Sequence, residues 1–170
     1  MTNEAGLWNV ANVLTMVRIV LVPVFVGFPG ETAADLNDLE LFLSHAGLDA
    51  IGIFGYSDED GTEAASLPGQ LDKAEIARRV EEFAGLADEL MAQRAESRLG
   101  ETLDVLIEEE SDDSVDPLRG CYLGRAAHQA PEVDGVTTVT SAAPLAAGDM
   151  VRAVVTGSDG VDLIADVKPR

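Results

Sequence analysis

The sequence predicts an α/β unit followed by an all-β domain, a small five-stranded barrel of the OB-like type. Two observations predict this order. Up to about residue 99, apolar runs alternate with stretches of helical spacing, whereas from Glu101 onward short alternating apolar and polar stretches are separated by turn residues. The chain has 170 residues, a length that suits one medium domain or two small ones.

An apolar run over residues 7–28 comes first and is long enough to cross a bilayer as a helix. Arg18 and Pro23 interrupt it and make insertion marginal. The β-branched residues of its second half instead favour a buried strand that ends at Gly27. We therefore expect a cytoplasmic protein, with membrane association as the disfavoured alternative.

The next stretch favours the strand because it continues as a βαβ unit. Thr32 with Asp35 makes an N-terminal capping box, apolar residues follow at helical spacing, and Gly47 is placed to stop the helix. A second apolar run, residues 50–56, predicts another strand. Strand, helix and strand within about 36 residues indicate a parallel pair.

A long helix is expected after the loop of residues 57–70, which is rich in Gly, Ser and Pro. Asp72 and Glu75 form another capping box, and the helix should end before Gly100. Its apolar face consists of Ile76, Val80, Phe83, Ala87 and Leu90. Charged residues on the other faces are typical of a solvated surface.

Five short strands are expected after Glu101, with turns at Gly135, Gly148 and Gly160. The residues expected to share the inner face are Leu103, Val105, Ile107, Val151, Ala153, Val155, Val161, Leu163, Ala165 and Val167. We expect the acidic run between Glu108 and Asp116 to be a loop between the first two strands.

The charge of the chain limits its partners. There are 31 Asp and Glu against 11 Lys and Arg, a net charge of -20, which repels phosphate backbones and favours a basic partner over RNA. The single cysteine, Cys121, cannot form an internal disulfide or hold a zinc ion or an iron–sulfur cluster alone. No nucleophile, base and orienting group occur at a recognisable spacing, so we expect no catalytic residue and no metal ligand in this chain.

Three sets of residues carry a family resemblance. The run from Gly27 to Thr32 is similar to a late barrel strand and turn of the radical SAM methylthiotransferases, and residues 54–68 are similar to their final strand and exit loop. Residues 101–168 are similar to their TRAM domain. The resemblance divides the chain into an apolar segment (1–26), a barrel remnant with a connecting helix (27–99) and a TRAM domain (100–168).

The stretch from Gly124 to Gly135 is similar to the RimO-type branch, whose members methylthiolate an aspartate of a small-subunit ribosomal protein. The resemblance implies an enzyme that uses two [4Fe-4S] clusters and S-adenosylmethionine. The cluster cysteines of the family have no counterparts here, so we expect a truncated methylthiotransferase that is inactive alone and holds no cofactor of its own.

The resemblance also implies two sets of site residues. It places near S-adenosylmethionine the turn residues Gly27, Pro29, Gly30 and Glu31. It places near the macromolecular substrate, a basic small-subunit ribosomal protein, the residues Arg125, His128, Gln129 and Glu132. The alternatives are plain turn geometry for the first set and an ordinary exposed loop for the second.

The start of the chain resembles a different family. The opening of the CDP-alcohol phosphatidyltransferases, notably phosphatidylglycerophosphate synthase, is similar to Asn9, Asn12, Leu14, Thr15, Arg18, Leu21 and Pro23. This resemblance implies a helical stretch over roughly residues 9–20 before the strand, but the aspartate-rich metal signature of that family is absent. The alternatives to a truncated methylthiotransferase are thus a stand-alone TRAM module that binds a ribosomal protein or RNA, and a membrane phosphatidyltransferase fragment.

Overall fold

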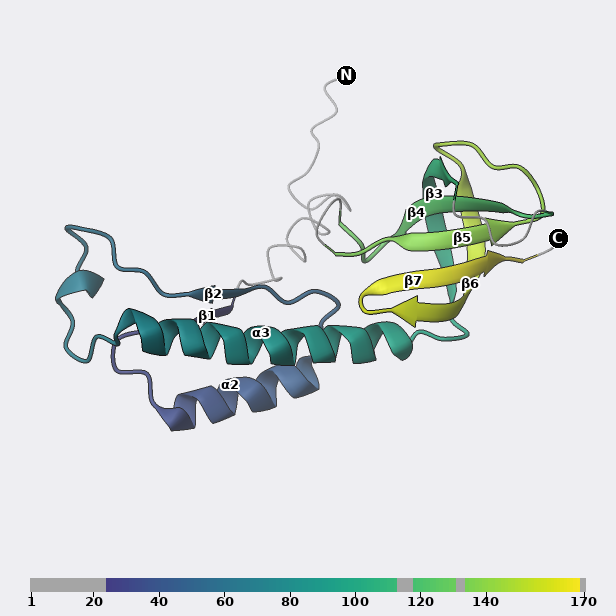
Figure 1. The fold of residues 1–170 in the computed structure, drawn as a ribbon. Helices are drawn as coiled ribbons and strands as arrows, with labels where there is room; N and C mark the ends of the chain where they lie inside the picture. The colour runs from purple at the N-terminus through teal and green to yellow at the C-terminus, as the bar shows by residue number, and fades with distance from the viewer. Residues whose placement is uncertain (1–23, 113–117, 131–133, 169–170) are drawn as a thin grey trace, which may run out of the picture.

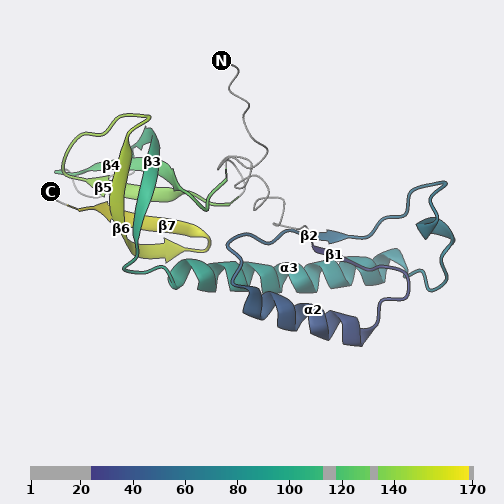
Figure 2. The same cartoon turned by 180° about the vertical axis from the view of Figure 1, so that it is seen from behind.

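The computed structural model describes residues 24–112, 118–130 and 134–168, and shows an α/β unit and a β-barrel joined by one long helix (Figure 1). The view from behind shows the same elongated arrangement, with the barrel at one end of the helix and the two-stranded sheet along the other part (Figure 2). The predicted fold class is confirmed.

The α/β unit consists of β1 (Val24–Val26), α2 (Ala33–Ala46) and β2 (Ile53–Gly55), with the two strands parallel. The capping box at Thr32 is formed, since its side chain accepts from the Asp35 amide and the Asp35 side chain accepts from the Thr32 amide. The helix ends at Gly47, whose φ of 60° lies in the left-handed region. The predicted βαβ unit is therefore confirmed, with shorter strands than the apolar runs indicated. A single 3-10 turn, η1 (Ala64–Ser66), lies in the following loop.

The long helix α3 (Lys73–Glu96) covers one face of the two-stranded sheet. Its N-cap Asp72 accepts from the Glu75 amide, but the Glu75 carboxylate binds Arg78 and Arg79 instead of returning to the cap, so the predicted box is half formed. Phe83 of α3 is buried with residues of β1 and α2, namely Val26 and Leu43.

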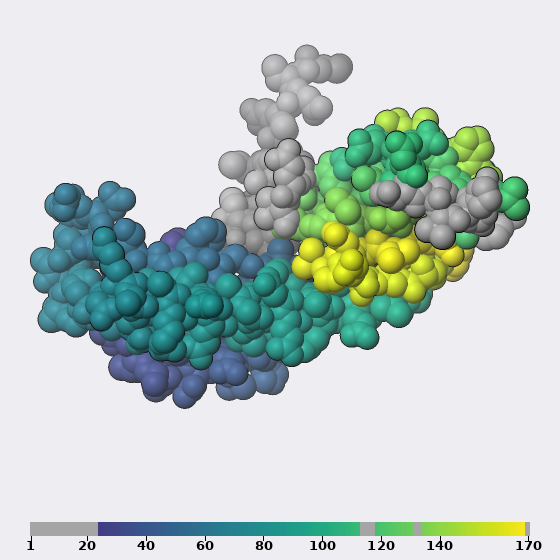
Figure 3. All heavy atoms as spheres, viewed as in Figure 1, coloured from purple at the N-terminus to yellow at the C-terminus, as the bar shows by residue number. Residues whose placement is uncertain are grey.

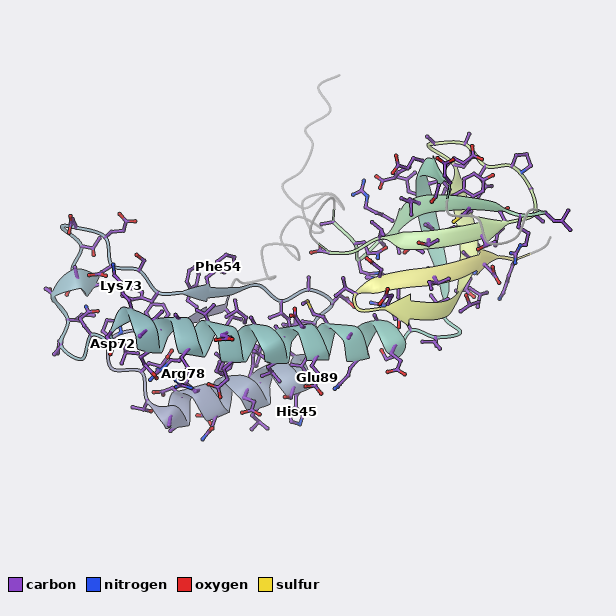
Figure 4. All side chains as sticks on the ribbon, in the orientation of Figure 1. His45, Phe54, Asp72, Lys73, Arg78 and Glu89 are labelled. Atoms are coloured by element: carbon purple, nitrogen blue, oxygen red, sulfur yellow. The ribbon has the colours of Figure 1, made fainter. Side chains whose placement is uncertain are left out.

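The other face of the two-stranded sheet exposes aromatic rings. Phe25, Phe28 and Phe54 are each about half exposed, at 46%, 45% and 51%. The ring centroid of Phe25 lies 6.4 Å from that of Phe28 and 5.8 Å from that of Phe54. Figure 4 shows Phe54 on the side of β2 that faces away from α3. Within the described residues no strand pairs with the outer edge of β1 or of β2.

The barrel is closed in the order β3-β4-β5-β7-β6. Its pairs are antiparallel except for the parallel pair β5 and β7. The strand bounds are β3 (Thr102–Ser111), β4 (Gly120–Ala126), β5 (Thr137–Ser141), β6 (Met150–Asp159) and β7 (Asp162–Val167). The core contains Val105, Ile107, Tyr122, Val139, Ala153 and Ala165. The predicted alternation of inward residues is confirmed, as is the tight turn between β6 and β7 at Gly160, whose φ is 56°.

One prediction for the barrel was wrong. The acidic run was expected to be a loop from Glu108, but β3 continues through Ser111 and pairs with β4 as far as Cys121. A register shift between Ile107 and Glu109 lets the strand bend there, and Arg125 on β4 neutralises Glu108. The acidic side chains of Glu108, Glu109 and Glu110 are tolerated in this strand because they are exposed to solvent, and Glu108 also has a cross-strand cation.

The end of α3 is fixed to the barrel. Ala95 is buried with Val155 and Leu163 of the β6–β7 hairpin. The Gly100 amide donates to the Val155 carbonyl at 2.9 Å, and the Val155 amide donates to the Glu101 carbonyl at 2.9 Å. The helix therefore runs into the first barrel strand without a free linker.

In the part of the chain that the structure describes, neither long helix combines the length and the apolarity that a bilayer span needs. The expected helical stretch of residues 9–20 lies outside the described residues. That the apolar run does not associate with a membrane stays a prediction.

The core of the barrel can be tested with two neighbours on β7. Leu163 is 0% exposed and Ile164 is 42% exposed. Leu163→Ala should lower the free energy of unfolding by about 2–5 kcal/mol, because it leaves a cavity between the barrel and α3. Ile164→Ala is the matched control and should cost about 1 kcal/mol or less. Urea unfolding followed by circular dichroism measures both, and equal losses would contradict the described inward face of β7.

Candidate functional site

The turn after β1 is held by one ion pair. The Glu31 Oε2 atom accepts from the Gly27 amide at 2.9 Å and lies 2.5 Å from the Arg79 Nη1 atom. Gly27 has a φ of 91°, and a Cβ atom there would lie 2.9 Å from the Ile76 side chain. Hydrogen bonding to Glu75 and Glu31 raises the pKa of Arg79. The buried guanidinium of Arg79 thus ties the turn to α3.

The backbone donors of this turn already have partners inside the chain. The Gly30 amide donates to the Gly69 carbonyl and the Glu31 amide to the Phe28 carbonyl, each at 3.0 Å. Plain turn geometry accounts for Gly27, and Pro29 lies in the same turn. Contact of Gly27, Pro29, Gly30 and Glu31 with S-adenosylmethionine stays a prediction.

The residues present do not fit an iron–sulfur cluster. The one cysteine of the sequence, Cys121, lies in β4 and is 7% exposed, whereas a cluster needs several converging thiolates. Among the described residues no three His, Cys, Asp or Glu side chains come together as metal ligands would.

Of the four residues predicted to seat a partner, Arg125 lies on the outer surface of β4. Its Nε atom donates to Glu108 Oε1 at 2.8 Å, and its Nη2 atom binds the same oxygen. This bond lowers the pKa of Glu108 and raises that of Arg125. The guanidinium is therefore already engaged by an acid of the neighbouring strand.

Gln129 has a supporting position rather than an exposed one. Its side chain is buried, and its Oε1 atom accepts from the Ala126 amide at 3.0 Å and from the Thr137 hydroxyl at 2.6 Å. These bonds hold the connection from β4 to β5. Glu132 lies outside the described residues. That Arg125, His128, Gln129 and Glu132 seat a partner stays a prediction.

His128 lies half-buried where the barrel meets the α/β unit, beside a charged cluster that the sequence did not reveal. Asp49 Oδ1, just before β2, accepts from Arg94 Nε at 3.0 Å and from Arg98 Nη2 at 2.5 Å. Arg98 Nη1 also donates to Glu101 Oε2 at 3.0 Å. Arg94 lies in the last turn of α3 and Arg98 just after the helix, but nothing in the sequence indicates that Asp49 would meet them.

This cluster shifts two pKa values. Burial, and then the charge of Arg98, lowers the pKa of His128. Burial alone would raise the pKa of Asp49, but the hydrogen bond and charge of Arg98, with the charge of Arg94, lower it overall. At neutral pH the junction therefore contains a neutral imidazole beside an ionised carboxylate.

Each of the seven arginines within the described residues has an acidic partner, while the acids outnumber them. The pairs are Arg78 with Glu75 and Glu82, Arg79 with Glu31, Arg94 with Asp49, Arg98 with Asp49 and Glu101, Arg119 with Asp166, Arg125 with Glu108, and Arg152 with Asp104. Arg78, labelled in Figure 4, lowers the pKa of Glu75 to about 2 through its hydrogen bond, assisted by Arg79. The described surface thus offers unpaired carboxylates rather than unpaired guanidinium groups.

The closed barrel and the sequence together define a protein that carries a TRAM domain, since residues 99–167 match that domain family. Over most of its length the chain is similar to the RimO methylthiotransferases, as the resemblance predicted. It is 55% identical over 144 residues to the ribosomal protein uS12 methylthiotransferase RimO of Streptomyces avermitilis. It is 55% identical over 147 residues to that of Salinispora arenicola and 54% identical over 143 residues to that of Streptomyces coelicolor.

These alignments cover 85%, 82% and 83% of this chain, and 28% of each relative. The chain thus spans less than a third of the length of the curated relatives that it matches.

The junction predicts a pH dependence of stability. The pKa of His128 lies below its ordinary value of about 6.5 in the folded chain, so the unfolded chain takes up a proton first as the pH falls. We expect the urea midpoint to decrease from about pH 7 to about pH 5, and His128→Asn to remove part of this decrease. His45→Asn, which replaces the other histidine on the exposed surface of α2, is the control and should keep the wild-type dependence. An unchanged dependence in His128→Asn would contradict the assignment.

Proposed function

We propose that this chain is the partner-docking part of a methylthiotransferase, and that its acidic surface seats a basic small-subunit ribosomal protein. The observation that carries this proposal is the distribution of charge. Every described arginine is ion-paired, yet the chain retains a net charge of -20. An acidic surface whose described arginines are all paired with acids attracts a positively charged partner and speeds its association.

The homology supports the identity of the partner. The curated relatives are named ribosomal protein uS12 methylthiotransferases, and the first two are 55% identical to this chain over 85% and 82% of its length. We therefore propose uS12 as the docked protein and the cytoplasm as the place where the two meet.

The chemistry is proposed to need residues that this sequence does not contain. The family resemblance implies two [4Fe-4S] clusters and S-adenosylmethionine in the full-length enzymes, but one buried thiol cannot hold a cluster. By this proposal the chain contributes binding and orientation of the protein substrate, and does not itself insert sulfur.

RNA is the disfavoured partner of the barrel. Binding to a phosphate backbone would require guanidinium groups to leave their carboxylates, including Arg125 from Glu108 and Arg119 from Asp166. The phosphatidyltransferase alternative depends on residues that precede β1, and no described contact favours it.

Binding can be measured by fluorescence anisotropy with labelled uS12. We expect saturable binding that weakens as the salt concentration rises, because the attraction is between charges. A single-stranded RNA of about 20 nucleotides is the comparison and should bind at least about tenfold more weakly. Absence of uS12 binding, or tighter binding of the RNA, would contradict the proposal.

The cofactor part is tested by anaerobic reconstitution with iron and sulfide. We expect less than one cluster per chain by iron analysis and visible absorption, and the same result for Cys121→Ala, because one nearly buried thiol supplies too few ligands. Stoichiometric cluster binding by the monomer would overturn this part.

A further inference from the structure

An open groove runs between α3 and the β6–β7 hairpin, with a volume of about 590 Å³. Figure 3 shows the hairpin lying against the half of α3 nearer the barrel, and Figure 4 labels Glu89 on that half. Glu89, Gln93 and Glu96 line the groove from α3. Leu99, which is 51% exposed, and the glycines at 157 and 160 complete it.

The groove is negatively charged and has no compensating cation among the described residues that line it. Within the described residues Glu96 has no ion pair, and Glu89 accepts a hydrogen bond only from Gln93 Nε2, at 3.2 Å. Arg94, on the same part of α3, and Arg98, just after the end of the helix, are both held by Asp49. A cationic side chain entering the groove would therefore meet two unneutralised carboxylates.

The hairpin wall of the groove is the edge of a strand. The pairing of β3 with β6 ends at Thr102 and Val154, but β6 continues to Asp159. Beyond Val155, β6 has β7 on one side, and the groove lies between it and α3 on the other. A strand edge without a strand neighbour is a surface along which an extended peptide can lie.

We propose that this groove binds an extended, lysine- or arginine-rich segment of the ribosomal protein. Glu89 and Glu96 are seven residues apart on α3, a rise of about 10 Å. In an extended segment this distance corresponds to basic side chains about three or four residues apart. The exposed side chain of Leu99 contacts the aliphatic part of one of them. The inference rests on the proposed function and assigns the docking to one place on the acidic surface.

The test compares two variants that remove the same charge. Glu89→Gln with Glu96→Gln neutralises the groove, and Asp38→Asn with Glu40→Gln neutralises two exposed acids of α2. Labelled uS12 is titrated with the full chain at low salt, and circular dichroism checks that each variant keeps its helices. We expect the groove variant to bind about three- to tenfold more weakly and the α2 variant less than about twofold. Glu96→Lys should weaken binding further, since it repels the cation.

The outcomes separate the two proposals. If the two double variants weaken binding equally, or if neither weakens it, the groove is not the binding site, while the proposal that the chain docks uS12 stands. Failure of the wild-type chain to bind uS12 overturns the proposed function and the groove with it. Greater weakening by the groove variants alone supports both.

Discussion

The structure depends on the packing of α3 against two different partners. Phe83, in the middle of the helix, is buried with Val26 and Leu43, and Ala95 near its end is buried with Leu163. Two three-residue strands would not be stable alone, so the α/β unit exists because the helix and α2 bury one of its faces. The barrel closes its own core and needs the helix only at the hairpin.

The same helix decides how charge is distributed. Arg94 and Arg98 bind Asp49, and these ion pairs fix the loop before β2 to the junction between α3 and the barrel. The charges of the two arginines are then neutralised within the chain. Arg79 likewise forms an ion pair with Glu31, in the turn after β1. Cations therefore stabilise the joints between elements, and the surface that remains for partners is acidic. The architecture and the proposed docking thus have a common electrostatic origin.

Local patterns in the sequence were sufficient for much of the fold. Thr32 and Gly47 set the ends of α2 through backbone geometry that involves only neighbouring residues, and the alternation of apolar residues set the inner face of the barrel. Contacts between distant residues were not predictable. Asp49 meets Arg98 only because the fold brings them together, and Gln129 is polar yet buried because its carbonyl oxygen satisfies two donors of the β4–β5 connection. The extension of β3 into an acidic run was missed because composition says nothing about a cross-strand partner.

The position of Cys121 makes it a native chemical probe of motions at the barrel surface. It is the one thiol of the chain, and it lies in β4 between strands on both sides, nearly closed to solvent. Because Cys121 alternates along β4 with the inward-facing Tyr122, its thiol lies on the outer face of the barrel, and a thiol reagent reacts with it at the rate of a free cysteine only when the residues that cover it there move away. The reaction rate in native buffer, relative to that of a free cysteine, therefore gives the fraction of time for which this part of the outer face is uncovered, without any introduced label. The exposed aromatic rings of the two-stranded sheet, at the far part of α3, contribute nothing to that signal.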